Sequence, residues 1–308
     1  MIFPRDFRRR WVLAPLVLAF ALLIPRAASP NTGRAQAIII DHKNTRLSDI
    51  PAEWITQAKE RLHIVYGHTS HGSQLTDGMT GLALWKGPLY AWNNGGTGRA
   101  LDLRAYNGDF GKLGIAGDLG GDITGNLNRT AWERATRAYL SEKPEVNVVI
   151  WAWCWQVGGA ESEIQLYLDL MSKLEKDFPN IKFVYMTGRV DGSPLKGNPW
   201  QILTPLRNQQ IRDYCLKHGK ILYDFADIES YDPDSNYYGD KLVNDNCDYD
   251  SNGDGVRDRN WAIDWQNVHP GEWYPCNAAH TQPLNANLKA YAAWWMWSRL
   301  AGWDGKSE

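Results

Sequence analysis

The sequence predicts an α/β protein in which helices cover both faces of a doubly wound parallel sheet of about five strands. Short apolar runs alternate with longer stretches whose apolar residues recur every three or four positions, which is the pattern of strands alternating with helices. The run at 146–153 is apolar at almost every position, as in a strand buried on both faces. A sheet of this kind binds ligands beyond the carboxyl ends of its strands.

The elements can be placed in order along the chain. Residues 62–66 alternate as a strand does, and the pattern ends at Gly67, after which a helix is expected to start. A glycine-rich stretch over 93–128 follows, with a candidate strand at 100–105. The remaining elements are expected to be helix 130–142, strand 146–153, helix 160–176, strand 181–186, helix 201–218, strand 220–224 and helix 284–300. Gly302 marks the end of the last helix.

The N-terminal residues are expected to be an export signal. Four arginines between positions 5 and 10 precede an apolar run at 11–24, and Ala35-Gln36-Ala37 is a small-residue cleavage site. We expect a signal peptide over 1–37, with an uncleaved anchor as the alternative, and a single secreted or periplasmic domain over 38–308. No later run approaches the roughly 20 apolar residues of a spanning helix, so we expect no membrane contact beyond export.

Net charge and aromatic content limit the classes of partner that we expect. The formal net charge of −2 gives no reason to expect a nucleic-acid partner. The chain holds 16 Trp and 14 Tyr, and exposed aromatic rings in secreted proteins often stack on sugars. Many of these residues lie within predicted strands and helices, however, where they would belong to the core. Carbohydrate binding is therefore one expectation beside an ordinary aromatic core.

Four cysteines in an exported chain permit two disulfides. Cys247 and Cys276 flank one loop-rich segment, and we predict that they pair. Cys154 ends an apolar strand and Cys215 lies on a helix. These two could pair, or they could remain as two buried thiols.

Ser70 is the candidate nucleophile. It lies in Gly67-His-Thr-Ser-His-Gly72, between the first strand and a helix start. A serine on a tight strand-to-helix turn exposes its hydroxyl, and the N–H groups of the helix start can receive developing negative charge. His280 lies just ahead of the last helix, where it could act as general base at the same end of the sheet. The alternative is that both residues only cap helices.

The order of elements and these motifs resemble the SGNH/GDSL hydrolase superfamily over about residues 62–303. Segment 208–224, which runs from Asn208 to Asp224, is similar to the penultimate helix and strand of that family, and the segment from His280 into the last helix is similar to its closing block. The resemblance implies a flavodoxin-like sheet. It also implies a serine esterase that removes acyl groups, with acetyl as the expected group, from carbohydrate or an acylated polysaccharide.

The chain departs from the family pattern at the catalytic acid. The family carries Asp three residues before its histidine, whereas Asn277 stands at that position here. An amide cannot stabilise an imidazolium as a carboxylate does. Either another acid, such as Asp264, takes that role, or Ser70 and His280 work as a dyad.

The oxyanion hole departs as well, because the usual Asn after the third strand is not visible. Gln156 could supply a side-chain amide in its place. The resemblance adds the backbone N–H of Ser70 and a glycine N–H at Gly120 or Gly121.

Three further histidines lie in polar surroundings: His68, His71 and His269. We expect them to contact substrate or to form hydrogen bonds in a polar cleft. The alternative is a catalytic metal held by His68 and His71 together with His269 or His280.

A calcium loop is the sharpest local motif. Oxygen side chains occupy its first, third, fifth and ninth positions, Gly255 is sixth, and the carbonyl of the seventh residue is a further ligand. The predicted ligands are Asp250, Asn252, Asp254, Val256 and Asp258. Trp261 replaces the usual Glu at the twelfth position, so the match is partial. We expect a structural Ca²⁺ that organises an insert over 231–276, with a plain turn as the alternative.

Two other functions stay open. The same scaffold could carry a hydrolase or lyase that cleaves glycan chains. The protein could also be a non-catalytic glycan-binding protein that uses its tryptophans.

Overall fold

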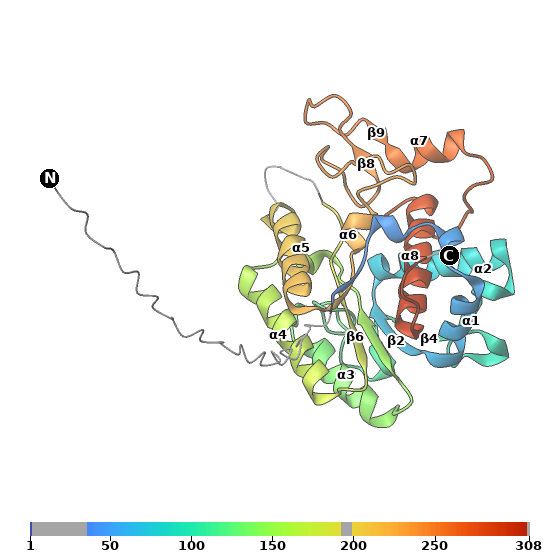
Figure 1. Ribbon diagram of the computed structural model, residues 1–308, viewed down its shortest axis with the longest axis vertical. Helices are drawn as coiled ribbons and strands as arrows, with labels where there is room; N and C mark the ends of the chain where they lie inside the picture. Colours follow the sequence, from blue (N-terminus) through green and yellow to red (C-terminus); the bar gives the residue numbers. More distant parts are fainter. Residues whose placement is uncertain (2–35, 192–198, 307–308) are drawn as a thin grey trace. The chain divides into compact units, whose positions relative to one another are not determined.

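A seven-stranded sheet forms the centre of the structure, a computed structural model that describes residue 1, residues 36–191 and residues 199–306 (Figure 1). The chain from Arg34 to Glu308 forms one structural unit. Residues 2–35, which hold most of the predicted signal peptide, lie outside the described residues. Within the described ranges, no helix is both long enough and apolar enough to span a bilayer.

All seven strands are parallel, and their spatial order is β1-β7-β6-β5-β2-β4-β3. They are β1 (Ile38–Ile40), β2 (His63–His68), β3 (Trp92–Asn93), β4 (Leu101–Asn107), β5 (Val148–Trp151), β6 (Lys182–Met186) and β7 (Ile221–Tyr223). The five predicted strands form the middle of the sheet. The expected count of five is corrected to seven by the two edge strands, β1 and β3, which span three and two residues.

Helices cover both faces, as predicted. They are α1 (Ala52–Arg61), α2 (Ser70–Lys86), α3 (Ala131–Glu142), α4 (Glu161–Asp177), α5 (Pro199–His218), α6 (Phe225–Ile228), α7 (Trp261–Val268) and α8 (Pro283–Ala301). Helices α1, α2 and α8 pack on one face of the sheet, and α3, α4 and α5 pack on the other (Figure 1). Alternation along a strand divides the core in the same way, since Ile64 and Tyr66 of β2 face the first group while Val65 faces the second.

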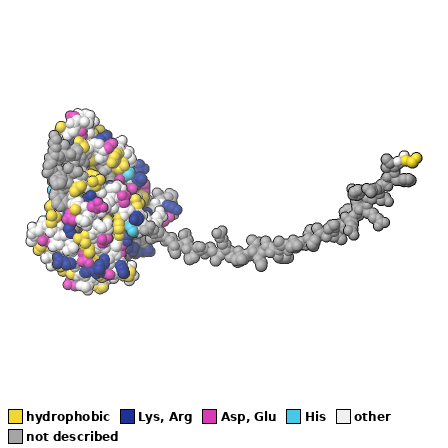
Figure 2. All heavy atoms as spheres, turned by 90° about the vertical axis from the view of Figure 1, so that its left-hand side faces the viewer, with side chains coloured by type: hydrophobic (Ala, Val, Ile, Leu, Met, Phe, Trp, Pro, Cys, Tyr) yellow, Lys and Arg dark blue, Asp and Glu magenta, His cyan; other side chains and the backbone are white. Residues whose placement is uncertain are grey.

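Many tryptophans belong to this core. Five of them are fully buried: Trp132, Trp151, Trp261, Trp294 and Trp297. A buried aromatic side chain removes about 150–250 Å² from water, so these rings supply much of the hydrophobic stabilisation. On the surface shown in Figure 2, basic and acidic side chains lie among scattered apolar ones.

The strand order places a topological switch point between β2 and β5. The chain runs from β2 to β4 on one side and then crosses back to β5 on the other, so the connections leave the carboxyl ends of β2 and β5 in opposite directions. Open α/β sheets bind ligands at such a switch point. Ser70 follows β2 and Cys154 follows β5, and the two segments are joined by a hydrogen bond from Ala152 N to Gly67 O (2.9 Å).

The predicted Cys247–Cys276 disulfide is wrong, because all four cysteines are free. The thiol of Cys247 lies 3.4 Å from Thr281 Oγ1, whereas that of Cys276 lies 3.5 Å from Asn287 Nδ2. The two sulfur atoms therefore contact different parts of the region around the start of α8. Cys154 and Cys215 are not paired either, and of these two only Cys215 is buried.

The segment between α6 and α8 carries short elements of its own and packs on the core of the main sheet. It holds a two-stranded antiparallel sheet, β8 (Asp248–Tyr249) and β9 (Arg259–Asn260), followed by α7. The predicted insert over 231–276 contains these elements. The same segment carries Asp245, which reaches back to the carboxyl end of the main sheet.

Candidate active site

Ser70 is the first residue of α2, directly after the turn that ends β2. Two glycines allow this turn to pack closely. A Cβ at Gly67 would lie 2.4 Å from the Trp151 ring, and one at Gly72 would lie 2.4 Å from His68 Cβ. Helix α2 begins without a side-chain cap, so the N–H groups of its first turn are available to negative charge.

His280 meets Ser70 from the other end of the chain. Its Nε2 lies 2.9 Å from Ser70 Oγ, across a separation of 210 residues. The His280 backbone is left-handed, with φ of 64°, a conformation that costs most side chains free energy and persists where neighbours enforce it. Gln74 of α2 supplies one such contact, since its Nε2 donates to the carbonyl of Ala279 at 2.5 Å. The predicted nucleophile and base are thus brought together.

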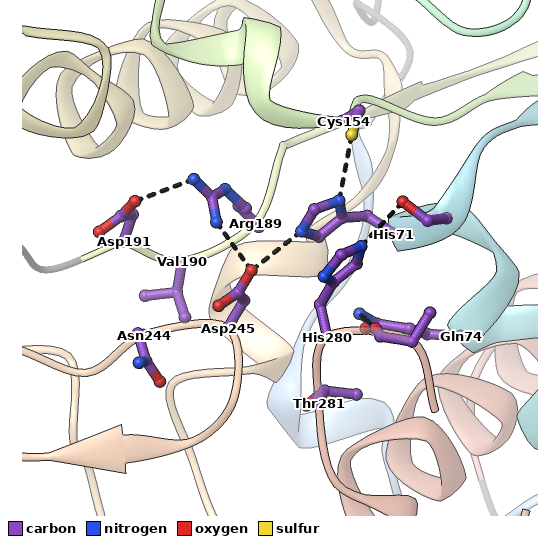
Figure 3. Close-up of polar contacts among 12 residues, drawn as sticks. His71, Gln74, Cys154, Arg189, Val190, Asp191, Asn244, Asp245, His280 and Thr281 are labelled. Carbon is purple, nitrogen blue, oxygen red and sulfur yellow. Dashed lines mark hydrogen bonds and ion pairs between the residues drawn. The ribbon is translucent and has the colours of Figure 1, made fainter. Parts of the chain in front are cut away.

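His71 packs flat against His280. The two ring centroids are 4.3 Å apart and the planes differ by 12°. His71 Nε2 lies 2.9 Å from Asp245 Oδ2, and His71 Nδ1 lies 3.2 Å from Cys154 Sγ (Figure 3). Arg189 also donates to Asp245, at 2.7 Å. A carboxylate therefore stands behind the second imidazole and not directly behind His280.

Burial and charge set the protonation of this cluster. Burial by itself would raise the pKa of Asp245, but the hydrogen bond from His71 and the charge of Arg189 lower that pKa to about 2. Burial lowers the pKa of His71, although Asp245 offsets part of this effect. Near pH 7 Asp245 is therefore ionised and His71 is neutral. The tautomer follows from its partners, with Nε2–H donating to Asp245 and the lone pair of Nδ1 facing the thiol.

The predicted acid positions lie elsewhere. Asp264 of α7 pairs with Arg259 at 3.0 Å, and Asn277 is exposed in the loop before His280. In the described part of the chain, neither side chain forms a hydrogen bond with His280. The structure therefore leaves Ser70 and His280 as a dyad beside the His71–Asp245 pair.

The predicted oxyanion donors are largely turned toward Asp118. Gly120 N donates to Asp118 Oδ1 (2.9 Å), and Gln156 Nε2 donates to Asp118 Oδ2 (3.3 Å). Thr69 Oγ1 also donates to that carboxylate, at 2.8 Å. Gly121 lies in the same loop, where its carbonyl accepts from the N–H of Gly117. The N–H groups at the start of α2 are therefore the better candidate for an oxyanion site. The glycine loop contacts the turn before Ser70 through the hydrogen bond from Thr69 to Asp118.

Two of the candidate histidines, His68 and His269, have contacts that are typical of structural residues. His68 is buried, its Nδ1 lies 3.0 Å from the Thr69 carbonyl, and burial lowers its pKa to about 4. His269 stacks on Trp265 in the insert, with ring centroids 4.0 Å apart. In the part of the chain that the structure describes, these histidines do not gather into a metal site with His71 or His280. The group of three metal-type ligands that does converge within the described ranges is Asp41, His42 and Asp227, which lie beyond the carboxyl ends of β1 and β7.

The predicted calcium loop is a tight turn in the insert. Asp250 accepts from the N–H groups of Gly253 and Gly255, each at 2.7 Å, and Asp258 accepts from Ser251 at 2.9 Å. Both glycines have positive φ, as such a turn requires. The carboxylates of Asp250, Asp254 and Asp258 are not gathered within 4.8 Å of one another in this described segment. The residue types fit a hard cation, and calcium stays a prediction.

A fully buried ion pair supports the site. Lys289 Nζ of α8 lies 2.6 Å from Glu229 Oε1, and neither side chain is exposed to solvent. Lys289 also donates to Gln74 Oε1, while Glu229 Oε2 accepts from Val190 N at 2.7 Å. Burial raises the pKa of Glu229 to about 6 despite Lys289. This network joins the helix of Ser70, the loop of His280 and the loop of Arg189.

Sequence reasoning assigned no role in this site to Asp245, Cys154 or Arg189. Cys154 had one usable signal, since it follows a buried strand at the ligand-binding end of the sheet. Asp245 had none, because it lies in an Asp-rich insert and meets His71 across 174 residues.

No family model matches the chain, and no curated protein matches it. The functional proposal therefore rests on the geometry and chemistry of the site.

Proposed function

We propose that the protein is a secreted or periplasmic serine esterase of the SGNH/GDSL type, with a flavodoxin-like sheet, that removes acyl groups from carbohydrate. The observation that carries the proposal is the 2.9 Å contact between Ser70 Oγ and His280 Nε2 at the switch point of the sheet. A nucleophile and base within hydrogen-bond reach, at the N-terminus of a helix, are the parts that acyl transfer requires.

The chemistry follows from these positions. Ser70 Oγ attacks the ester carbonyl while His280 Nε2 takes its proton, and His280 then protonates the leaving alcohol. Water repeats the sequence on the acyl-serine. The N–H groups at the start of α2 stabilise the oxyanion, and one such donor is typically worth about 3–4 kcal/mol.

His71 takes over the orienting role that a carboxylate has in a triad. Its ring lies flat against His280, and Asp245 and Cys154 hold that ring from both nitrogen atoms. Because burial keeps His71 neutral, the His280 imidazolium formed during the reaction faces an uncharged ring. A neutral aromatic face attracts a cation, whereas a second imidazolium would repel it.

A carbohydrate substrate is supported by the surface around the site. His280 is exposed, so a bulky acylated polymer can approach. Trp155 follows Cys154 directly and is 41% exposed, which offers an aromatic face for a sugar ring. Acetyl is the acyl group proposed, as the resemblance to the SGNH/GDSL superfamily implies.

A second candidate, glycan binding without catalysis, is favoured by a different feature. A cavity of about 520 Å³ lies at the far end of α2 and is lined in part by Trp85, Tyr90, Trp265 and Tyr291. Aromatic side chains of this kind suit sugar rings. This cavity could also serve an esterase by holding the chain of the polymer.

Ester hydrolysis distinguishes the two functions. We expect the wild-type protein to hydrolyse a chromogenic acetate and to release acetate from acetylated plant polysaccharides. Ser70→Ala should lower the rate by at least about 1,000-fold while leaving the unfolding temperature and polysaccharide binding unchanged. Binding without hydrolysis by the wild-type protein would favour the second candidate.

A further inference from the structure

Cys154, His71 and Asp245 form a chain of hydrogen bonds that ends at the Cys154 thiol. Its Sγ lies 3.2 Å from His71 Nδ1, and Nε2 of the same ring lies 2.9 Å from Asp245 Oδ2. A nucleophile, a base in reach of it and a third group that orients the base form the arrangement by which catalytic triads are recognised. In the described chain no carboxylate contacts His280, whereas His71 beside Cys154 is held directly by Asp245 (Figure 3).

The sulfur lies close to Ser70. Cys154 is partly exposed, unlike Cys215 and Cys247, which are buried. The hydroxyl groups of Thr69 and Ser70 lie close enough to the sulfur to influence its ionisation. Cys154 also follows the carboxyl end of β5, so an acyl group bound at the switch point is within reach of both nucleophiles.

In the resting protein, the protonation states of Cys154 and His71 suit an attack in which a base removes the thiol proton. Burial and the charge of Asp118 raise the pKa of the Cys154 thiol, and burial lowers the pKa of His71. Near pH 7, Cys154 is therefore a protonated thiol and His71 is a neutral imidazole. This is the resting state in which a base removes the proton during attack, as in serine triads, and it differs from a preformed thiolate.

We propose that Cys154 is a second nucleophile of this site, with His71 as its general base and Asp245 orienting that base. The substrates are acyl esters, so the inference rests on the acyl-transfer function proposed above. The sulfur attacks the ester carbonyl carbon and its proton passes to His71 Nδ1. The carbon–oxygen bond then breaks, and the leaving alcohol takes that proton. The acyl group remains on Cys154 as a thioester, which water, deprotonated by His71, hydrolyses to the acid and the free thiol.

The Ser70→Ala protein isolates this second route. The full chain is mixed with p-nitrophenyl acetate, the reaction is stopped with acid, and the acetyl group is located by peptide mass spectrometry. We expect an acetyl group on Cys154 that neutral hydroxylamine removes, as a thioester requires. Asp245→Asn in the same background should slow acetylation of Cys154 by about 100-fold or more, because it removes the charge that orients His71.

Cys276→Ala in the Ser70→Ala background is the matched thiol control, because Cys276 is also partly exposed but has no histidine partner in the structure as described. Its acetylation rate at Cys154 should equal that of the parent. An unmodified Cys154 in a folded Ser70→Ala protein would overturn the proposal, and so would a rate that Asp245→Asn leaves unchanged. Failure of the esterase proposal is a different result, namely that the wild-type protein itself hydrolyses no ester.

A second measurement covers the case in which Ser70→Ala does not fold. The wild-type protein is treated with iodoacetamide and the alkylated cysteines are identified over time. We expect Cys154 to react first, at a rate that falls in Asp245→Asn. Reaction of Cys276 ahead of Cys154 would contradict the inference.

Discussion

His280 holds its imidazole against Ser70 from a backbone conformation that few side chains adopt. The left-handed φ of 64° directs the ring back toward the start of α2, and the bond from Gln74 to the Ala279 carbonyl keeps the turn in place. Strain of this kind, of order 1–3 kcal/mol, is often found where side chains must meet at a functional site. At the residue scale the site is therefore defined by one contact that the surrounding side chains enforce.

The identity of the acid can be tested with two isosteric substitutions. Asp245→Asn should lower kcat for ester hydrolysis by about 100-fold with little change in KM, because a misplaced His71 no longer holds His280 in line. Asp264→Asn, which removes the carboxylate that pairs with Arg259, should leave kcat unchanged. Steady-state kinetics on a chromogenic acetate decides this. The reverse pattern would show that Asp264 serves His280.

His68 should make stability depend on pH. Burial lowers the pKa of His68 from 6.5 to about 4, so the unfolded chain binds a proton there between these values while the folded protein does not. The contribution of His68 is therefore complete above pH 6.5 and is lost as the pH falls to about 4, by about 3 kcal/mol. Urea unfolding at pH 7 and pH 4.5 measures this loss. His68→Gln should show a smaller loss, and an unchanged loss would refute the assignment.

At the element scale, a buried ion pair links α8 to the residue that follows α6, and through Gln74 to α2. Lys289 and Glu229 lie 2.6 Å apart with no exposure, and Gln74 completes the link to the Ser70 helix. The sequence predicted a helix start near Ser70 and a helix over 284–300, but it predicted neither α6 nor the ion pair. A lysine in the middle of an apolar helix is read as a surface residue until its partner is known.

Breaking this pair should be costly. Lys289→Met leaves Glu229 buried without a counter-charge, and we expect it to lower the free energy of unfolding by about 3–5 kcal/mol. Lys289→Met with Glu229→Leu should recover most of the loss, because it removes both charges. Chemical denaturation of the single and double variants measures the effect. A single variant as stable as the wild type would contradict the buried pairing.

The insert that carries β8, β9 and α7 should respond to calcium. If loop 250–258 binds Ca²⁺, saturating calcium raises the unfolding temperature, and a concentration of 100 times Kd adds about 2.7 kcal/mol. Asp250→Ala should abolish that response. Thermal unfolding in calcium and in chelator, for the wild type and this variant, is the measurement. Equal unfolding temperatures in both conditions would identify the loop as a plain turn.

The two edge strands show the limit of element prediction. Four of the five central strands have four or more residues, whereas β1 and β3 span three and two residues. The fifth, β7, also has three residues, but it lies in segment 208–224, which resembles the family. Such strands are formed by pairing with a neighbour and not by their own periodicity. The disulfide prediction was wrong for a related reason, because the positions of Cys247 and Cys276 along the chain do not determine where their thiols point.

At the scale of the whole molecule, the site is assembled from four distant parts of the chain. Ser70 and His280 could be predicted because each precedes a helix and resembles a family motif. Asp245 and Cys154 could not be assigned, because they meet His71 across 174 and 83 residues and no local pattern encodes those contacts. The parallel topology brings them together, so the complete cluster could be recognised only once the strand order was known.

The central claim is that Ser70 carries the acyl group during the reaction. A serine-directed fluorophosphonate, added to the full chain and followed by peptide mass spectrometry, tests it most directly. We predict loss of ester hydrolysis in parallel with one adduct on Ser70, formed much more slowly in His280→Ala. Full inhibition with the adduct on another residue, or hydrolysis that continues at the wild-type rate with Ser70 fully modified, would contradict the account.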